Sequence, residues 1–433
     1  MVFLCVNNLY SQLYKKSGRE SSTYCGEAYG RNFSRPRIKV GIFKIRPMNK
    51  IDEVLTRGVT NVIPSPNQLK KVLSSGKKLN IYLGIDPTMT KIHLGHAVPL
   101  RKLQTFSEMG HNVTFLIGDF TALIGDTSDK DSERPILTEE EIEKNFRSYK
   151  KQAKKFLDFS KIKIHYNSEW LQKLSFAAAI KLVQNFSLGD FISRELIKKR
   201  LTDGKHVRLD ETLYPVMQGY DSYFMNTDIQ LGGADQTFNM QAGRLLQKKL
   251  RSKESFILVN DYLIGTDGRK MTKSWGNAVW VEDSPDDMFG KLMSISDKLV
   301  SNYYILATAL SLNQIKEKIN ELKDQPLNLK KHLAFAVVSE LHSKTAAQKA
   351  LKNFEKTFQE KSPNFDLQIP LGSSLAETIS PYTSLSSVSE AKRLIAQGAV
   401  TVDGHTLKDP TFHLKLGQKV QIGKRVFGTI VKK

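Results

Sequence analysis

Two short apolar runs near the start of the chain carry its first structural signal. The runs NIYLGID (80–86) and NVTFLIG (112–118) are rich in residues that favour buried strands. Between them, HAVPLRKLQTFSEMG (96–110) has the length of a helix and ends at a glycine. Strand, helix and strand in this order predict a βαβ unit of a parallel sheet, which binds ligands where its strands end.

The pattern on either side of this unit predicts further elements. One helical pattern begins at Met48, and a second helix begins at the Pro-Ser-Pro sequence 64–66 and ends at Gly76. Strand and turn character returns in DIQLGGADQ (228–236), and a helix is predicted from about 235 to 250. The run FILVNDYLIG (256–265) is predicted to be a further strand.

Residues from about 130 to 205 are predicted to form an insertion of helices. Thr138 and Glu141 have the spacing of a capping box. Apolar residues then follow with helical period, namely Ile142, Phe146, Tyr149, Ala153 and Phe156.

The remainder of the chain divides into a helical segment and a small mixed one. Beyond about 283 the pattern is helical and rich in lysine, and Pro363 and Pro370 mark a linker near 361–372. Residues 373–433 begin with the helix-like SVSEAKRLIAQG and continue with short strands and glycine turns. The predicted organisation is an α/β parallel-sheet domain at 48–282, an α-helical domain at 283–362 and a small α+β domain at 373–433, preceded by a basic extension at 1–47.

Composition narrows the class of protein. The chain has 433 residues, 40% hydrophobic and 25% charged, as in an ordinary globular protein, with a formal net charge of +21. Such a charge favours a polyanionic partner such as RNA, although a solubility role or a generally cationic proteome would give the same excess. The two cysteines, Cys5 and Cys25, exclude a cysteine-based metal site and give no sign of a disulfide framework. No apolar run approaches the roughly 20 residues that span a bilayer.

The first 47 residues differ from the rest. They carry nine Lys or Arg against Glu20 and Glu27, and show no clear helical or strand period. This composition resembles an organelle transit segment, but a disordered extension or a misassigned start codon before Met48 also fits.

Two distant motifs suggest a nucleotide site. In IHLGHAVPL (92–100), His93 and His96 lie three residues apart on the first turn of the predicted helix, where free backbone N–H groups favour phosphate. Gly95 lies between them and would let a base or ribose approach the backbone closely. In KMTKS (270–274), Lys270 and Lys273 could neutralise charge as pyrophosphate leaves ATP.

A third cluster suggests the lining of a pocket. Tyr214, Gln218 and Asp221 stand at i, i+4 and i+7, so a helix beginning near Pro215 would place them on one face. The same pattern would also suit an exposed amphipathic face.

Taken together, these motifs resemble the class I aminoacyl-tRNA synthetases. The strings YLGIDPT, GHNVTFLIGDFTALIGD, YPVMQGYDS, LGGADQTFN and MFGKLMSISD are similar to bacterial-type tyrosyl-tRNA synthetases, from about Met48 to the C-terminus. The resemblance implies a tyrosine–tRNA ligase that forms tyrosyl-adenylate and pyrophosphate from tyrosine and ATP, with Mg²⁺ on the phosphates, and then charges tRNA. It also implies a homodimer joined through the helical insertion and a C-terminal RNA-binding domain of the S-four type. No structural metal is expected, and the cytoplasm is the default location.

The resemblance also assigns roles to individual residues. Catalysis would involve His93, His96, Lys270, Lys273, Lys130 and Arg134. Tyrosine would be bound by Tyr82, Thr121, Asp126, Tyr214, Gln218, Asp221 and Gln236, with Tyr82 and Asp221 on its phenol group. ATP would be bound by Gly84, Asp86, His93, Gly95, His96, Gly233, Asp235, Lys270 and Lys273. RNA phosphates would be bound by Lys392, Arg393, Lys424 and Arg425.

One departure from the family pattern affects these roles. After Asp126 the chain has Thr127-Ser128-Asp129, where the family usually has Pro, Ser or Thr, and Gly. The changed backbone and the added carboxylate weaken the roles of Lys130 and Arg134. The departure favours one alternative, an RNA-binding relative with weak catalysis. A tryptophan-specific relative is a second alternative that stays open.

Overall fold

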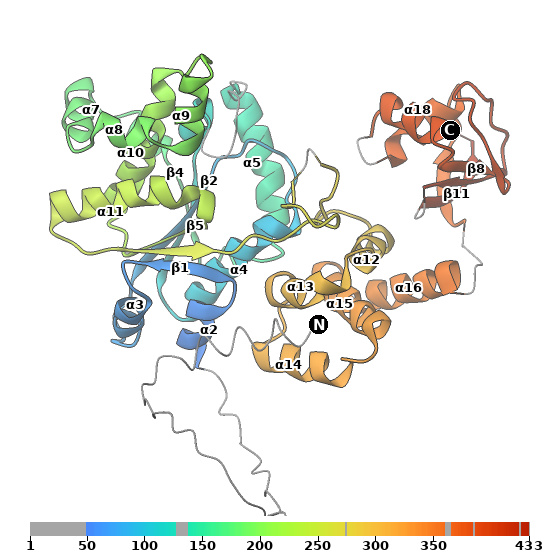
Figure 1. Ribbon diagram of the computed structural model, residues 1–433, viewed down its shortest axis with the longest axis horizontal. Helices are drawn as coiled ribbons and strands as arrows, with labels where there is room; N and C mark the ends of the chain where they lie inside the picture. The colour runs from blue at the N-terminus through green and yellow to red at the C-terminus, as the bar shows by residue number, and fades with distance from the viewer. Residues whose placement is uncertain are drawn as a thin grey trace, which may run out of the picture. The chain divides into compact units, whose positions relative to one another are not determined.

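The computed structural model describes residues 49–126, 137–272, 275–359, 365–383, 386–423 and 426–432 (Figure 1). Several predictions lie outside these ranges. They are the extension at 1–47, the departure at 127–129, and the roles of Lys130, Arg134, Lys273, Lys424 and Arg425.

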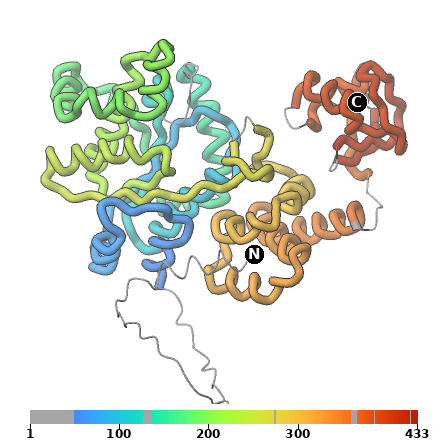
Figure 2. The backbone as a smooth tube through the Cα atoms, in the orientation of Figure 1, coloured from blue at the N-terminus to red at the C-terminus, as the bar shows by residue number. Residues whose placement is uncertain are grey.

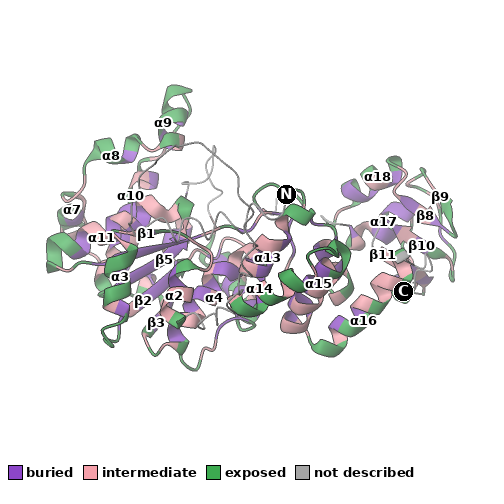
Figure 3. Cartoon of the chain, turned by 60° about the horizontal axis from the view of Figure 1, so that its bottom comes forward, coloured by how far each residue is buried: buried purple, intermediate pink, exposed green. Residues whose placement is uncertain are grey.

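The first part of the chain is built on a six-stranded sheet in the order β1-β6-β5-β2-β3-β4. Its strands are β1 (Val59–Ile63), β2 (Asn80–Ile85), β3 (Asn112–Ile117), β4 (Lys163–Tyr166), β5 (Ile229–Gly233) and β6 (Phe256–Asn260). The five strands from β6 to β4 run parallel, whereas β1 pairs antiparallel with β6. In Figure 3 the strands β2 and β5 are drawn mainly as buried. The predicted parallel sheet is confirmed.

Helices connect and cover these strands. They are α2 (Lys50–Thr56), α3 (Pro66–Leu73), α4 (Leu94–Glu108), α5 (Glu139–Ala153), α6 (Ser168–Leu171), α7 (Phe176–Val183), α8 (Leu188–Ile192), α9 (Glu195–Thr202), α10 (Leu209–Phe224) and α11 (Thr237–Arg251). The single turns η1 (Thr121–Leu123) and η2 (Ala234–Gln236) follow β3 and β5. The predicted capping box begins α5, since the Thr138 side chain accepts from the Glu141 backbone and Glu141 accepts from Thr138.

Three details differ from the sequence prediction. Strand β1 was not predicted, because VTNVI forms a sheet edge on which only Val62 is buried. The helical insertion also contains strand β4, whose four residues are too few and too polar to give a strand pattern. Finally, α10 begins at Leu209, so Pro215 lies inside the helix instead of starting it.

The next part is helical, as predicted. It contains α12 (Pro285–Met293), α13 (Val300–Ala307), α14 (Leu312–Glu321), α15 (Pro326–Leu341) and α16 (Lys344–Phe354), with the short turns η3 (Asp297–Leu299) and η4 (Glu355–Gln359). Figure 2 traces the yellow segment after β6 into these orange helices. One continuous hydrophobic core contains Leu100 of α4, Phe289 of α12 and Val337 of α15. The sheet and the helices therefore share their interior.

The C-terminal part has its own core and a five-stranded sheet in the order β7-β11-β10-β8-β9. Its elements are β7 (Leu367–Pro370), α17 (Leu375–Ile379), η5 (Ser380–Tyr382), α18 (Val388–Ala396), β8 (Val400–Val402), β9 (His405–Thr406), β10 (Lys419–Ile422) and β11 (Val426–Val431). The α+β prediction is confirmed. The predicted linker at 361–372 is wrong in part, because β7 pairs in parallel with β11 and buries Ile369 completely.

Throughout the described ranges, no helix combines the length and apolar character needed to cross a membrane.

Candidate active site

The polar residues of the candidate site follow the carboxyl ends of neighbouring parallel strands. Asp86 follows β2, Thr121 lies in η1 after β3, and Asp235 and Gln236 lie in η2 after β5. Because β5, β2 and β3 are adjacent and parallel, these ends meet at one edge of the sheet. Helix α4 begins at the same edge, eight residues after Asp86.

His93 and His96 form a stacked pair at the start of α4. Their ring centroids lie 3.7 Å apart with the planes inclined by 18°. The Nδ1 atom of His96 accepts a hydrogen bond of 3.3 Å from the backbone N–H of His93. The two rings therefore lie face to face at the N-terminus of this helix.

Both rings are neutral at physiological pH. Burial, then the charges of His96 and Lys270, lower the pKa of His93 to about 2. Burial and the Lys270 charge lower the pKa of His96 to about 4. The imidazoles can therefore present N–H donors to a phosphate, but they carry no charge before it binds.

Backbone N–H groups in the first turn of α4 already have hydrogen-bond acceptors within the protein. The backbone N–H of Leu94 donates to Val279 O at 2.9 Å, and that of His96 donates to His93 O at 2.9 Å. A Cβ atom added at Gly95 would lie 3.0 Å from the His93 ring. The prediction of free N–H groups is therefore wrong for Leu94 and His96, because carbonyl groups of the chain accept from both. The approach of a ligand at Gly95 stays a prediction.

The KMTKS segment, which follows β6, also approaches the start of α4. Strand β6 leads into a loop in which Trp280 forms a backbone bridge with His93. The Nζ atom of Lys270 lies 3.8 Å from the carboxylate of Asp235. The structure thus brings together Lys270, Asp235 and the histidine pair, as the two motifs predicted.

A chain of hydrogen bonds links the ends of β2 and β3 to helix α10. The hydroxyl of Tyr214 donates to Asp86 Oδ2 at 2.8 Å, and that of Thr121 donates to Asp86 Oδ1 at 2.8 Å. Asn167 then donates to Thr121 Oγ1 at 3.0 Å and to Asp221 Oδ2 at 3.2 Å. Tyr214 and Asp221, two turns apart on α10, therefore belong to one network.

Asp221 is a buried carboxyl group with an altered acidity. Its Oδ1 accepts from the indole N–H of Trp170 at 2.7 Å. Burial is the main effect and raises the pKa of Asp221 to about 7, although the hydrogen bonds from Trp170 and Asn167 oppose the rise. The carboxyl group therefore changes charge near neutral pH.

Tyr82 lies inside the sheet layer close to this network. Its hydroxyl donates to Gln230 Oε1 at 3.2 Å, and Gln230 in turn donates to the backbone of Met240 at 2.9 Å. Burial and then the Asp221 charge raise the pKa of Tyr82 well above its usual range. Tyr82 packs in a buried apolar cluster with Leu116 and Trp170.

Asp126 and Gln236 form a second polar group. The Nε2 atom of Gln236 donates to Asp126 Oδ2 at 2.6 Å, and Asn239 lies 3.5 Å from the same oxygen. Gln218 is half-buried one turn from Tyr214 on α10. The predicted tyrosine-site residues therefore lie in the segments that follow β3 and β5, on α10 or, for Tyr82, within β2.

The surroundings of the glycines of the predicted ATP site differ, with a close contact at Gly233 and ordinary van der Waals contact at Gly84. An added Cβ atom would meet the Asp235 carboxylate at 2.5 Å at Gly233, and the Tyr82 ring at 3.5 Å at Gly84. At Gly118 it would come within 2.1 Å of Asp86 and 2.4 Å of Thr121. Gly118 is thus the residue that lets the Asp86–Thr121 hydrogen bond form.

Several residues of the site escaped sequence prediction. They are Gly118, Asn167, Trp170, Gln230 and Asn239. Each contacts a predicted residue from another element, and no local spacing indicates such a contact. Only the burial of Gln230 within a predicted strand offered a signal, because a buried polar residue needs a partner.

Two of the predicted RNA contacts lie on α18. Lys392 and Arg393 are both exposed there. Arg393 forms an ion pair of 2.7 Å with Glu390 one turn earlier. An RNA phosphate would therefore compete with this carboxylate for the guanidinium group.

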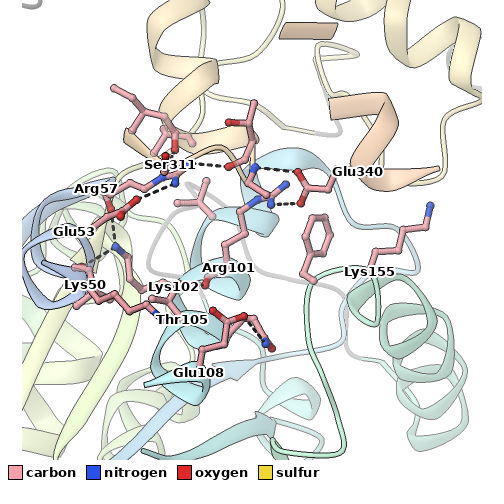
Figure 4. Close-up of a pocket in the computed structure, with 18 residues that line it drawn as sticks. Lys50, Glu53, Arg57, Arg101, Lys102, Thr105, Glu108, Lys155, Ser311 and Glu340 are labelled. Carbon is pink, nitrogen blue, oxygen red and sulfur yellow. Dashed lines mark hydrogen bonds and ion pairs between the residues drawn. The ribbon is translucent and has the colours of Figure 1, made fainter. Parts of the chain in front are cut away.

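A separate cavity of about 550 Å³ lies on the middle of α4 (Figure 4). Arg57 and Arg101 point into it, and they donate to the backbone carbonyls of Ile305 and Ala307 in α13. Arg101 also pairs with Glu340. These arginines are engaged with α13 and α15, so the cavity marks a joint between the sheet and the helices.

Among the described residues, no group of three or more His, Cys, Asp or Glu side chains is arranged to hold a metal ion. The prediction that the protein carries no structural metal remains a prediction.

Family comparisons agree with the fold and the site. The pattern described as "tRNA synthetases class I (W and Y)" matches residues 74–359, and the S4 domain matches residues 384–420. The chain therefore belongs to the class I tRNA synthetases of the tryptophan and tyrosine group.

Curated relatives within this family are tyrosine–tRNA ligases. The ligase of Carboxydothermus hydrogenoformans is 40% identical over 402 residues, which cover 88% of this chain and 97% of that protein. Tyrosine–tRNA ligase 2 of Vibrio cholerae is 40% identical over 385 residues, covering 87% and 97%. The predicted bacterial-type family is confirmed.

Solved structures share the fold. A C-terminally truncated mitochondrial tyrosyl-tRNA synthetase of Coccidioides posadasii aligns with a TM-score of 0.60 and 23% identity, covering 70% of this chain and 91% of that one. The tyrosyl-tRNA synthetase of Archaeoglobus fulgidus, solved with L-tyrosine, aligns with a TM-score of 0.54 and 22% identity, covering 70% and 100%.

Proposed function

We propose that the protein is a tyrosine–tRNA ligase. It activates L-tyrosine with ATP to tyrosyl-adenylate and pyrophosphate, and then transfers tyrosine to the 3′-terminal adenosine of its tRNA. The observation that carries this proposal is the meeting of the His93–His96 pair and Lys270 at the sheet edge that also holds the Tyr82 and Asp221 networks. Relatives that are 40% identical over most of the chain support the same activity.

The proposed tyrosine site divides into two ends. At the phenol end, Tyr82 and Asp221 bind the substrate hydroxyl, because both are buried polar groups and phenylalanine has no hydroxyl to meet them. At the other end, Asp126, Tyr214 and Gln218 bind the ammonium group. Thr121 and Gln236 lie beside the reacting carboxylate.

ATP lies on the other side of that carboxylate in this proposal. Gly84, Asp86, Gly95, Gly233 and Asp235 line the adenosine. His93, His96, Lys270 and Lys273 contact the phosphates, and Lys130 and Arg134 reach the departing pyrophosphate.

Catalysis requires positioning and stabilisation of charge, with no covalent nucleophile on the protein. The tyrosine carboxylate attacks the α-phosphorus in line with the leaving pyrophosphate. The neutral imidazoles donate N–H groups to the phosphate oxygens, and Lys270 offsets the negative charge that grows on the leaving group. Mg²⁺ bound to the ATP phosphates would supply further charge neutralisation.

Pyrophosphate exchange into ATP tests the proposal. Exchange that depends on tyrosine is expected in the wild-type protein. The same exchange should be much slower in the Lys270→Ala variant. Exchange dependent on tryptophan would instead indicate a tryptophan enzyme. No exchange with any amino acid would indicate an RNA-binding relative without catalysis.

Transfer to tRNA uses the basic surface of the protein in this proposal. The net charge of +21 attracts the RNA backbone. Lys392, Arg393, Lys424 and Arg425 contact its phosphates. Removing the charge at Lys392 should weaken tRNA binding and reduce its salt dependence, without changing pyrophosphate exchange.

A homodimer is also part of the proposal, because helices α7, α8 and α10 carry exposed apolar side chains. Phe176 is 82% exposed and Leu188 65%, both in the segment that the family resemblance assigns to the subunit contact, and Leu209, just beyond that segment, is 75% exposed. The variant Phe176→Glu/Leu188→Glu is expected to sediment as a monomer. Dimers of unchanged stability in that variant would contradict the proposal that this surface forms the dimer contact.

The cytoplasm is the proposed location, where tRNA charging supports translation. A fluorescent fusion carrying residues 1–47 alone should remain in the cytoplasm. Delivery of that fusion to an organelle would favour a transit segment instead.

A further inference from the structure

We infer that Asn277 is a positioning residue for Lys270, because its side chain fixes the backbone that carries this lysine into the site. This inference rests on the proposed function and adds a residue to its machinery. Asn277 stands outside the two motifs, seven residues after Lys270, and its side chain faces back toward the start of the loop.

The side-chain amide of Asn277 forms its hydrogen bonds with one segment, residues 267–272. Its Nδ2 donates to Lys270 O at 3.1 Å and to Asp267 Oδ1 at 2.7 Å. Its Oδ1 accepts from the backbone N–H of Thr272 at 2.9 Å. One side chain therefore holds the peptide groups on both sides of Met271, which directly follows Lys270.

Close packing leaves Asn277 little freedom. The residue is 2% exposed. A Cβ atom added at Gly265 would lie 2.3 Å from Asn277 Nδ2, so the backbone at Gly265 lies directly against the amide. The Asn277 carbonyl accepts from Thr266 N–H at 3.0 Å, which fixes the main chain as well. A buried amide with these partners specifies one geometry of the loop.

Asp267 strengthens this arrangement. Although partial burial opposes the change, hydrogen bonds from Asn277 and Arg269 lower the pKa of Asp267 to about 2. Its carboxylate is therefore ionised at neutral pH and accepts a charge-assisted bond from the amide. Gly265 N–H donates to Arg269 O at 2.6 Å, and a backbone bridge joins Ile264 to Lys270. Residues 264–270 thus form a tight hairpin whose open side is closed by Asn277.

The hairpin determines where Lys270 points. Its ammonium group lies 3.8 Å from Asp235, and its charge acts on both His93 and His96. Two residues beyond Asn277, Val279 O accepts the backbone N–H of Leu94 at the start of α4. Asn277 therefore lies between the lysine that the reaction needs and the helix that carries the histidines.

Asn277→Asp tests the inference in the full-length protein. It keeps the acceptor for Thr272, removes both N–H donors and places a second carboxylate beside Asp267. We expect kcat for tyrosine-dependent pyrophosphate exchange to fall about 100-fold, because a shift of about 1 Å in a catalytic group has an effect of this size. The KM for tyrosine should change less than about twofold, since the tyrosine site lies outside the hairpin.

A matched control and a double mutant separate positioning from general damage. Asn328→Asp makes the same chemical change at an exposed amide that donates to Gln325 at 2.7 Å, and it should leave exchange unchanged. In a Lys270→Ala background, Asn277→Asp should lower kcat by less than about threefold, because the lysine side chain that Asn277 positions is already absent. An equal loss in both backgrounds would overturn the inference, as would a matching rise in the KM for tyrosine.

If Asn277→Asp fails to fold by circular dichroism, Asn277→Ser replaces it, with the same loss expected in wild type and the same insensitivity in Lys270→Ala.

These outcomes remain distinct from failure of the proposed function. A wild-type protein without tyrosine-dependent exchange would remove that function, and this inference with it. An active wild type whose Asn277→Asp variant exchanges normally would overturn the inference alone.

Discussion

The imidazole rings of His93 and His96 stack with their centroids 3.7 Å apart at the first turn of α4. Two protonated rings at this distance would repel each other, and the pKa values of about 2 and about 4 keep both neutral. Positive charge at the proposed phosphate site before ATP binds thus comes from lysine, while the imidazoles supply hydrogen-bond donors.

Removing either kind of group should slow adenylate formation. His96→Ala or Lys270→Ala is expected to lower the single-turnover rate by about 10²–10³-fold, the usual cost of losing one transition-state donor. The dissociation constant for tyrosine should stay within about threefold. Lys298→Ala, at an exposed lysine, serves as the control. A loss confined to tyrosine binding would contradict the proposed role.

Tyrosine affinity should depend on pH through Asp221. The pKa of this carboxyl group is raised to about 7, so it is mostly protonated at pH 6 and mostly ionised at pH 8. The ionised form is the stronger acceptor for a phenol O–H, so the dissociation constant for tyrosine should fall as the pH rises between these values. Calorimetry with phenylalanine, which has no hydroxyl, should show no such trend. A trend that persists in Asp221→Asn would assign it to another group.

The same pKa has a consequence for stability. Because the pKa of Asp221 in the folded protein lies above the ordinary value of 3.8, the folded state binds more protons than the unfolded state between about pH 4 and 7. The contribution of Asp221 to the free energy of unfolding should therefore decrease as the pH rises through this window. Urea titrations of wild type and Asp221→Asn at pH 5 and pH 7.5 measure the difference.

Tyr82→Phe should reduce discrimination between tyrosine and phenylalanine. The change removes one hydroxyl partner of the substrate and leaves Gln230 without its donor, at a cost of about 1–3 kcal/mol. The ratio of kcat/KM for tyrosine over phenylalanine should fall about 10- to 100-fold. An unchanged ratio would show that the Tyr82 hydroxyl does not meet the substrate.

Stability of the α10 region should depend on a buried ion pair. Arg200 and Glu211 meet at 2.7 Å with side chains 2% and 0% exposed. Removing one partner, as in Glu211→Gln, should lower the free energy of unfolding by about 3–5 kcal/mol, because it leaves a buried guanidinium uncompensated. The double variant Arg200→Met/Glu211→Leu should recover much of this loss. Urea unfolding at fixed protein concentration measures both, and a double variant no better than the single one would refute the argument.

Sequence patterns located the elements that have strong periodicity. β2, β3, α4 and the α5 capping box lie within a few residues of their predicted positions, because each carries its apolar or capping pattern within itself. β1, β4 and β7 were missed because they are short or polar edge strands, whose pairing depends on a distant partner.

The candidate site shows the same division. His93, Lys270, Tyr82 and Asp221 could be named from motifs, and the fold brings them to one edge of the sheet. Their supporting partners could not be named, because Gln230 lies 148 positions from Tyr82, and Trp170 lies 51 from Asp221. The pKa values of Asp221 and of both histidines could not be predicted from the sequence either, because burial is the main cause of their shifts.

Arg57 and Arg101 donate to the carbonyls at the end of α13, and Arg101 pairs with Glu340 of α15. A chimera that joined the sheet of this protein to the helices of a relative would keep the backbone acceptors, but it would keep the ion pair only with an acidic residue in place of Glu340. Such a hybrid would need Arg101 and Glu340 to come from the same parent.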